Sequence, residues 1–146
     1  MQIAGTVTNL LREKSPKVWS ISSQATVYEA IELMAAKNIG AVPVVDGGNF
    51  IGILTERDYS RKVILKGLSS RQALVSEIMS RHPVTVDPEV TVEECMRLMT
   101  DKRVRHLPVL ENGMLMGILS IGDVVKWTIS AQTAQIDQLT KYVYGE

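Results

Sequence analysis

The chain has 146 residues but only one cysteine, two tryptophans and one phenylalanine, and its charges cancel. A single cysteine, Cys95, excludes an internal disulfide. Sixteen basic and sixteen acidic side chains leave no excess field to attract nucleic acid or an anionic membrane. The apolar runs are far shorter than the roughly 18 residues of a membrane span, and the start lacks a signal-peptide profile. These absences favour a cytoplasmic protein with neither nucleic-acid nor membrane partners.

Residues for metal or nucleophilic chemistry are equally scarce. The two histidines, His82 and His106, have no cysteine or acid at ligand spacing, so no metal site is predicted. Cys95 lies at helical spacing from Val92 and Met99, which favours a small core residue over a reactive thiol. The sequence also lacks a glycine-rich phosphate loop with its lysine, and a catalytic triad. We therefore predict that the protein is not an enzyme.

What the chain does contain is an internal repeat. A shift of about 65 residues places GILTERD, which begins at Gly52, on GILSIGD, which begins at Gly117. The same shift aligns the two halves without a gap from Thr26 to Asp58 of the first copy. A match of this length indicates a duplicated structural unit.

Each copy has the pattern of a β-α-β-β-α unit. A short β-prone piece, at residues 18–21 and 84–86, precedes a stretch with a helical apolar face. Two apolar runs follow, joined at Gly47-Gly48 and at Asn112-Gly113, pairs that tolerate the positive φ of two-residue hairpin turns. A second helix closes each copy.

We therefore predict an α/β (α+β) fold in which two tandem repeats pack about a pseudo-twofold axis. One copy of about 60 residues would bury only a modest core alone. The predicted repeats are 6–66 and 72–130, within a single module of 1–146. Residues 131–146 form a helix-prone C-terminal tail that could pack on the body or on a partner subunit. Paired clefts between the copies would be the expected place for a ligand.

The stretch after each hairpin carries a hydroxyl and a carboxylate three residues apart, Thr55 with Asp58 and Ser120 with Asp123. One interpretation is a capping box, in which the two side chains bind free N–H groups at a helix start. Another is a ligand site at the end of a strand, where an acid accepts both hydrogen bonds of a ribose diol. The hydroxyl and the helix start can favour a phosphate there. The two interpretations are compatible.

With these residues in view, the duplicated unit resembles a CBS-domain pair, also called a Bateman module. The resemblance rests on GILTERD, GILSIGD and the RHLPV of the second copy, and it covers about Thr6 to Trp127. It implies a non-enzymatic module that binds an adenosine ligand between its repeats, such as AMP, ADP, ATP, NAD(H) or S-adenosylmethionine. It also implies homodimers in which two modules form a flat disc.

The resemblance implies a role for individual residues as well. Asp58 and Asp123 match the ribose-binding acids, and Thr55 and Ser120 match the hydroxyls that contact ribose or phosphate. The segments whose backbone reads the adenine edge, and whose apolar side chains sandwich the ring, are Trp19, Ser20 and Ile21 in the first copy and Val84, Thr85 and Val86 in the second.

A phosphate also needs cations, and arginine suits bidentate contacts. The phosphate-binding candidates are Arg57, Arg103, Arg105 and His106. For Lys102, Arg61 and Lys62 a solvated charged face is an equal alternative. The second copy has Arg105-His106 where the first has Gly40-Ala41. We therefore predict two adenosine sites of unequal affinity, one of them suited to a longer ligand such as NAD.

Three functions follow from the sequence. The leading hypothesis is an adenine-nucleotide sensor for AMP, ATP or NAD(H), whose ligand shifts a geometry read by an unknown regulated protein. The alternative is a ligand-free dimerisation or interaction scaffold. The third, a nucleotide-processing enzyme, is disfavoured because each copy supplies one acid and nothing activates a nucleophile.

Overall fold

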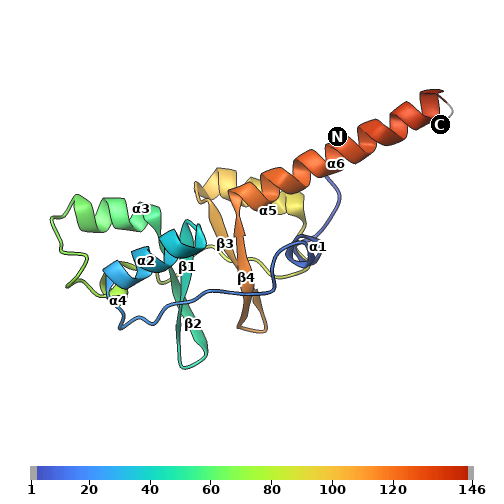
Figure 1. The fold of residues 1–146 in the computed structure, drawn as a ribbon. Coiled ribbons are helices and arrows are strands. Elements are labelled where there is room, and N and C mark those ends of the chain that lie inside the picture. The colour runs from blue at the N-terminus through green and yellow to red at the C-terminus, as the bar shows by residue number, and fades with distance from the viewer. Residues whose placement is uncertain (1–2, 145–146) are drawn as a thin grey trace. The chain divides into compact units, whose positions relative to one another are not determined.

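The computed structural model describes residues 3–144 (Figure 1). Residues 1, 2, 145 and 146, the ends of the predicted module and tail, lie outside the described residues. Close contacts divide the chain into two compact units. Unit 1 combines the described parts of 1–16 and 117–146 with 85–110, and unit 2 combines 17–84 with 111–116. The fold is mixed α+β with two small antiparallel sheets, as predicted.

Unit 2 contains the helices and the hairpin of the first repeat, followed by a short helix from the start of the second. Its elements are α2 (Val27–Lys37), β1 (Ala41–Asp46), β2 (Asn49–Thr55), α3 (Glu56–Asp58), the π-helix η1 (Tyr59–Ile64) and α4 (Val75–Ile78). The β1–β2 hairpin turns at Gly47 and Gly48, whose φ angles of 55° and 82° require glycine-like freedom. The predicted two-residue turn is confirmed.

Helix α2 is capped at both ends by residues that favour a helix start and a helix end. The Thr26 hydroxyl accepts from the Glu29 N–H, and the Glu29 carboxylate accepts from the Thr26 N–H, both at 3.2 Å. The buried side of the helix is formed by Val27, Ala30 and Met34, the helical apolar face expected from their spacing. Asn38, left-handed with φ 54°, ends it.

The core of unit 2 includes residues from the start of the second repeat. The Val75 side chain of α4 is fully buried together with Val27 and Leu54. Main-chain bonds fix it there, because the Val75 N–H donates to Ala25 O at 2.8 Å and the Val27 N–H donates to Ala73 O at 2.9 Å. Helix α4 therefore packs on the first repeat.

Gly52, the glycine of GILTERD, lies against the backbone that follows α4. Ile53 and Ser80 exchange two N–H···O bonds of 3.0 and 2.8 Å. A Cβ atom on Gly52 would lie 2.5 Å from the Ser80 carbonyl oxygen. This glycine is therefore required by the approach of a second backbone.

Unit 1 contains the helices and most of the hairpin of the second repeat, together with the first helix of the chain. Its elements are α1 (Val7–Arg12), α5 (Val92–Lys102), β3 (His106–Glu111), β4 (Met114–Ser120) and α6 (Ile121–Tyr144). The β3–β4 hairpin turns at Asn112 and Gly113, with φ angles of 52° and 80°. The second predicted turn is also confirmed.

Helix α1 packs on the second repeat. The Val7 N–H donates to Val90 O at 2.8 Å, and the Val92 N–H donates to Gly5 O at 3.0 Å. The short helix at the start of each repeat, α1 or α4, thus belongs to the unit that contains most of the other repeat. The contact units and the sequence repeats 6–66 and 72–130 therefore divide the chain differently.

The β-prone pieces at 18–21 and 84–86 form single parallel bridges rather than strands. Ile21 bridges Val44, and its N–H donates to Pro43 O at 3.0 Å. Val86 bridges Val109 in the same way. Continuing the ladder toward residue 19 would need an N–H from Pro43, which proline lacks. Because Pro108 repeats this position, both predicted strands shorten to one residue for the same reason.

Helix α6 is continuous over 24 residues and covers the described part of the predicted tail. Its first half packs on α5 and α1, and its second half projects away from them (Figure 1). In the described range, no helix combines the length and the apolar character that a bilayer crossing needs.

Candidate functional site

Thr55 and Asp58 form a capping box at the start of α3. The Asp58 N–H donates to Thr55 Oγ1 at 3.1 Å, and Asp58 Oδ2 accepts from the Thr55 N–H at 3.0 Å. The Ser80 hydroxyl donates to the same carboxylate at 3.3 Å. Only 10% of the Asp58 side chain is exposed. The capping interpretation is therefore confirmed here, with a third donor from the segment after α4.

Lys62 neutralises this carboxylate. Its ammonium nitrogen lies 3.1 Å from Asp58 Oδ1 and donates to the Ile78 carbonyl at 3.0 Å. Lys62 follows Asp58 by four residues, so the two side chains share one face of a helix. The nearly buried acid thus has a counterion that is fixed at a second point.

Ser120 and Asp123 repeat this arrangement at the start of α6. The Asp123 N–H donates to Ser120 Oγ at 3.1 Å, and Asp123 Oδ2 accepts from the Ser120 N–H at 2.8 Å. The Asp123 side chain is 23% exposed, so solvent reaches it more easily than Asp58.

Asp123 also has a lysine partner. Lys14 Nζ lies 2.7 Å from Asp123 Oδ2 and donates to the Ile118 carbonyl, also at 2.7 Å. Burial raises the pKa of Asp123, but the hydrogen bond and charge of Lys14 and the hydrogen bonds of Ser120 outweigh it. They hold the pKa below its ordinary value, so the carboxylate is ionised at neutral pH.

In both copies an ammonium therefore bridges the acid and a main-chain carbonyl. The sequence repeat could not reveal this, because Lys62 and Lys14 occupy unrelated positions. Lys62 has a local signal, its i+4 spacing from Asp58. Lys14 has none, because it lies 109 residues from Asp123 in the chain.

The residues predicted to face adenine lie in extended segments of both units. The Trp19 ring has the ammonium groups of Lys37 and Lys17 at 4.0 and 4.8 Å from its centroid. Ser20 is exposed and Ile21 is half-buried. An adenine that stacked on Trp19 would share the ring with these cations or displace them.

The second segment is placed similarly. Val84 is half-buried, Thr85 is exposed and Val86 is buried. The N–H of Val86 donates to Pro108 O, and its carbonyl accepts from the Leu110 N–H. The bridge therefore uses both main-chain groups of Val86, as it does those of Ile21. Only neighbouring main-chain groups could read an adenine edge.

The phosphate candidates divide between the units. Arg57 is exposed in α3, whereas Arg103 and Arg105 are exposed and His106 is half-buried around the start of β3. The structure brings Arg105 to the second capping box, because its carbonyl accepts from the Ile121 N–H at 2.8 Å. In the first copy the corresponding carbonyl belongs to Gly40, which accepts from the Glu56 N–H. A cation is thus present beside one capping box where the other has a glycine.

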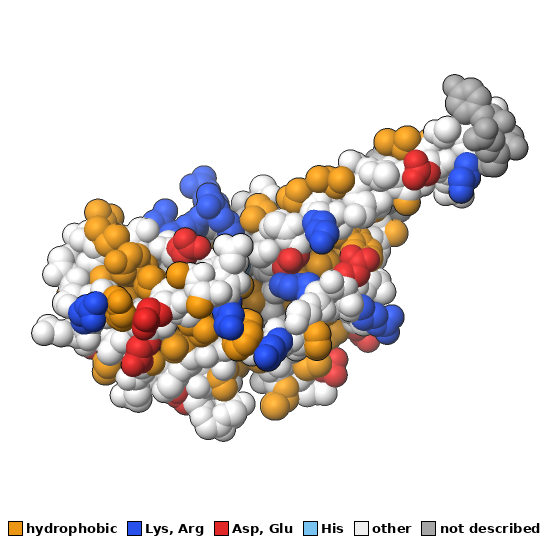
Figure 2. All heavy atoms as spheres, viewed as in Figure 1, with side chains coloured by type: hydrophobic (Ala, Val, Ile, Leu, Met, Phe, Trp, Pro, Cys, Tyr) orange, Lys and Arg blue, Asp and Glu red, His pale blue; other side chains and the backbone are white. Residues whose placement is uncertain are grey.

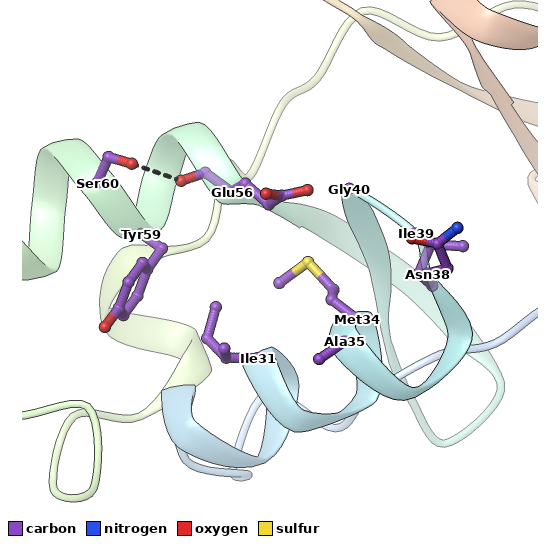
Figure 3. A pocket seen from close by; sticks show the side chains of 9 residues that line it. All are labelled: Ile31, Met34, Ala35, Asn38, Ile39, Gly40, Glu56, Tyr59 and Ser60. Carbon is purple, nitrogen blue, oxygen red and sulfur yellow. Dashed lines mark hydrogen bonds between the residues drawn. The ribbon is translucent and has the colours of Figure 1, made fainter.

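Unit 2 contains a pocket that the sequence did not indicate (Figure 3). Its volume is about 410 Å³, and α2 and the α3–η1 segment form its walls. Met34 and Ile31 provide apolar surface, while Glu56 and Tyr59 point toward the same space from the opposite wall. The lining includes none of the residues predicted to bind a nucleotide, and no motif marked it in the sequence.

The possible metal ligands are dispersed over the described residues, and the cysteine is buried. Within residues 3–144, no three histidine, cysteine or acidic side chains gather as metal ligands would. Cys95 is fully buried, which confirms the predicted core role. Burial, followed by the charge of Glu94, raises the pKa of the Cys95 thiol to about 11.

The comparison with known families decides what the duplication is. A family model described as CBS domain matches residues 10–64 and 75–130, together more than half of the chain. The chain belongs to the CBS-domain family. Both matched segments contain a hairpin and the capping box that follows it, so the predicted resemblance is confirmed. CBS domains are in general regulatory modules without catalysis of their own.

Individual relatives agree with this assignment. A solved structure of a candidate signal-transduction protein with CBS domains from Burkholderia ambifaria MC40-6 is 47% identical, with a TM-score of 0.84 over 88% of this chain and 96% of that one. The mitochondrial CBS domain-containing protein CBSX3 of Arabidopsis thaliana is 37% identical over 96% of this chain and 72% of its own length. A hexameric CBS-CP12 protein from bloom-forming cyanobacteria is 31% identical, with a TM-score of 0.74 over 85% of this chain and 68% of that one.

Proposed function

We propose that this CBS-domain protein is a non-enzymatic sensor that binds an adenine nucleotide, AMP, ATP or NAD(H), and signals to a regulated protein. The observation that carries the proposal is a capping box, present in both copies, whose carboxylate is paired with a lysine. In each copy a carboxylate and a hydroxyl lie together at a helix start after a strand. A ribose diol and a phosphate need this combination of acceptor and N–H donors.

The second capping box is the better candidate for tight binding. Asp123 is the more exposed acid, and its lowered pKa keeps it a hydrogen-bond acceptor at neutral pH. Ser120 stands at the start of a 24-residue helix, whose N-terminus favours a phosphate. Arg105, beside this helix start, can add a cation. The two sites would therefore differ in affinity.

Binding at Asp123 would act on Lys14. A ribose that donates to the Asp123 carboxylate competes with the ammonium for the same oxygen. Lys14 could then turn to the phosphate, which would loosen its bond to Ile118 in β4. Because Lys14 follows α1, this exchange would couple the ligand to the N-terminal segment and give a partner protein a change to read.

The proposal is tested by thermal unfolding with AMP, ATP and NADH. We expect at least one nucleotide to raise the Tm of the wild type by mass action. Asp123→Asn should remove most of this rise, and Asp58→Asn should remove the rest. The matched control is Asp101→Asn, an exposed acid of α5 that pairs with Arg97. A rise that survives both substitutions contradicts the site.

A scaffold function is the second candidate, and the hexameric cyanobacterial neighbour favours it. We propose a homodimer for this chain in either case, because oligomers occur among its neighbours. If no nucleotide raises the Tm while self-association is retained, the scaffold function replaces the sensor. The cytoplasmic location stays a prediction, and cell fractionation tests it.

A further inference from the structure

Helix α6 carries two faces with different surroundings. One face packs inside unit 1: Val124 is buried, the Trp127 indole N–H donates to Ala4 O at 2.8 Å, and the Thr128 hydroxyl lies 3.7 Å from the Met96 sulfur. These contacts anchor the first half of the helix. Over the same stretch of the helix, Val125 and Ile129 are exposed.

A second face is an apolar stripe, which we call the α6 seam. It consists of two series spaced by seven residues, Ile129, Ile136 and Val143 in one, and Val125, Gln132 and Leu139 in the other. The five apolar members are between 50% and 69% exposed. Figure 2 shows hydrophobic side chains recurring along the projecting part of the helix, with few charges between them.

The geometry of the helix separates the seam from the anchored face. At about 100° per residue, the six members fall within an arc of about 80°, centred about 100° from the anchored residues. So narrow a stripe is typical of a two-stranded coiled coil, whereas a helix that packs on a globular body has a wider one.

We propose that the α6 seam pairs in parallel and in register with the seam of a second copy of this chain. The first series has β-branched residues at all three positions, and the second contains Leu139. β-Branched residues at the a positions with leucine at d favour two parallel strands. The proposal deepens the homodimer proposed above by naming the surface that forms it.

Gln132 gives the direction of pairing. In a parallel, in-register pair it faces Gln132 of the second copy, and the two amides satisfy each other. In the antiparallel pair that aligns the two seams, it would face Ile136, which leaves a polar group without a partner. A single polar residue in an apolar seam commonly fixes register in this way.

Charge and area also favour a second copy over a charged partner. Of the flanking positions in residues 126–142, Lys126, Thr128, Thr133, Gln135, Thr140 and Tyr142, only the first is charged. A basic or acidic partner helix would find little to pair with. With Ile121, the apolar residues of the seam expose an area on the order of 600 Å² per helix. A symmetric pair would bury at most about 1,200 Å² of it, which is the lower bound of stable interfaces.

Disulfide trapping tests the direction. In the nucleotide-free protein, Gln132→Cys should form a covalent dimer on mild oxidation, whereas Ser130→Cys on the opposite face should not. Cys95 is fully buried with a raised pKa, so it should not compete. Absence of the Gln132→Cys dimer, or an equal yield from Ser130→Cys, overturns the parallel seam.

Sedimentation equilibrium tests the contribution to assembly. The double variant Ile129→Glu with Ile136→Glu should weaken self-association at least tenfold, because it buries four charges in each pair. The control, Ser130→Glu with Gln138→Glu, adds the same charge away from the seam. Circular dichroism verifies that both remain folded. Unchanged self-association of the seam variant overturns this proposal but leaves nucleotide binding, measured separately, untouched.

Discussion

The two repeats hold their acids in the same way with lysines of different origin. In the first copy Lys62 comes from η1, four residues after Asp58, and in the second copy Lys14 comes from the segment after α1. Each ammonium also binds a main-chain carbonyl, Ile78 or Ile118. A partly buried carboxylate needs a fixed counterion. What the copies share is therefore the position of a charge rather than the residue that supplies it.

The Asp58–Lys62 ion pair is a local contact in the sequence, whereas the Lys14–Asp123 ion pair is a long-range contact. Lys62 stabilises the start of its own helix and fixes it to α4, close by in the chain. Lys14 connects the start of α6 to the N-terminal segment, 109 residues away from Asp123. A change at Asp123 should therefore alter the segment that follows α1, whereas a change at Asp58 should not.

The largest difference between the copies should be the loss of stability when each of the two aligned glycines is replaced by alanine. A Cβ on Gly52 would meet the Ser80 carbonyl at 2.5 Å, but one on Gly117 would meet the end of the Leu11 side chain at 3.1 Å. Backbone cannot move aside as a leucine methyl can. We expect Gly52→Ala to lower the free energy of unfolding by about 3 kcal/mol and Gly117→Ala by less than about 1 kcal/mol. Urea unfolding measures both, and equal losses would contradict the different packing.

In the second copy, the contribution of Asp123 to the free energy of unfolding should depend on pH, and this effect should be smaller. Because the pKa of Asp123 is lower in the folded chain than in the unfolded chain, its ionised form stabilises the fold above the ordinary carboxyl pKa of about 4. This contribution is lost as the pH falls through the lowered value. The stability advantage of wild type over Asp123→Asn should thus be full at neutral pH and shrink under acid conditions.

Urea unfolding at several values between neutral and strongly acidic pH measures this advantage. The exposed Asp101→Asn serves as the control. A constant difference between wild type and Asp123→Asn across the range would show that Lys14 does not hold this acid ionised.

The smallest difference in stability should appear at the C-terminal ends of α2 and α5. Asn38 and Arg103 occupy matching positions, and both are left-handed with φ 54°. Asparagine tolerates this conformation better than arginine. Arg103→Gly should therefore raise the free energy of unfolding by about 1 kcal/mol, and Asn38→Gly by a few tenths. If Arg103 also binds phosphate, Arg103→Gly should weaken nucleotide binding while it stabilises the fold.

Much of this arrangement could be predicted because it depends on residues that are close together in the sequence. The duplication, both hairpin turns and both capping boxes depend on residues within a few positions of one another. The shortening of the predicted strand at 18–21 depends instead on its pairing partner Pro43, 22 residues beyond Ile21, and the β-prone composition of 18–21 could not show it. Side-chain contacts between distant segments have no such signal, so the Lys14 ion pair and the packing of α1 and α4 could not be predicted.

The pocket of unit 2 illustrates the same limit. Its apolar residues Ile31 and Met34 have the spacing of an ordinary core face. Only the positions of Glu56 and Tyr59 opposite them leave a space, and those positions depend on how α3 and η1 leave the sheet. Periodicity predicts which face of a helix is apolar but not whether a neighbour fills it.

The placement of the two tryptophans has a practical consequence for spectroscopy. Trp19 lies in unit 2 close to the ammonium groups of Lys17 and Lys37, and Trp127 lies in unit 1 with its indole N–H donating to Ala4 O. The sequence has no third tryptophan. Replacing either one with phenylalanine leaves a single fluorophore that reports on one unit, so the melting of each half can be followed separately in an otherwise intact chain.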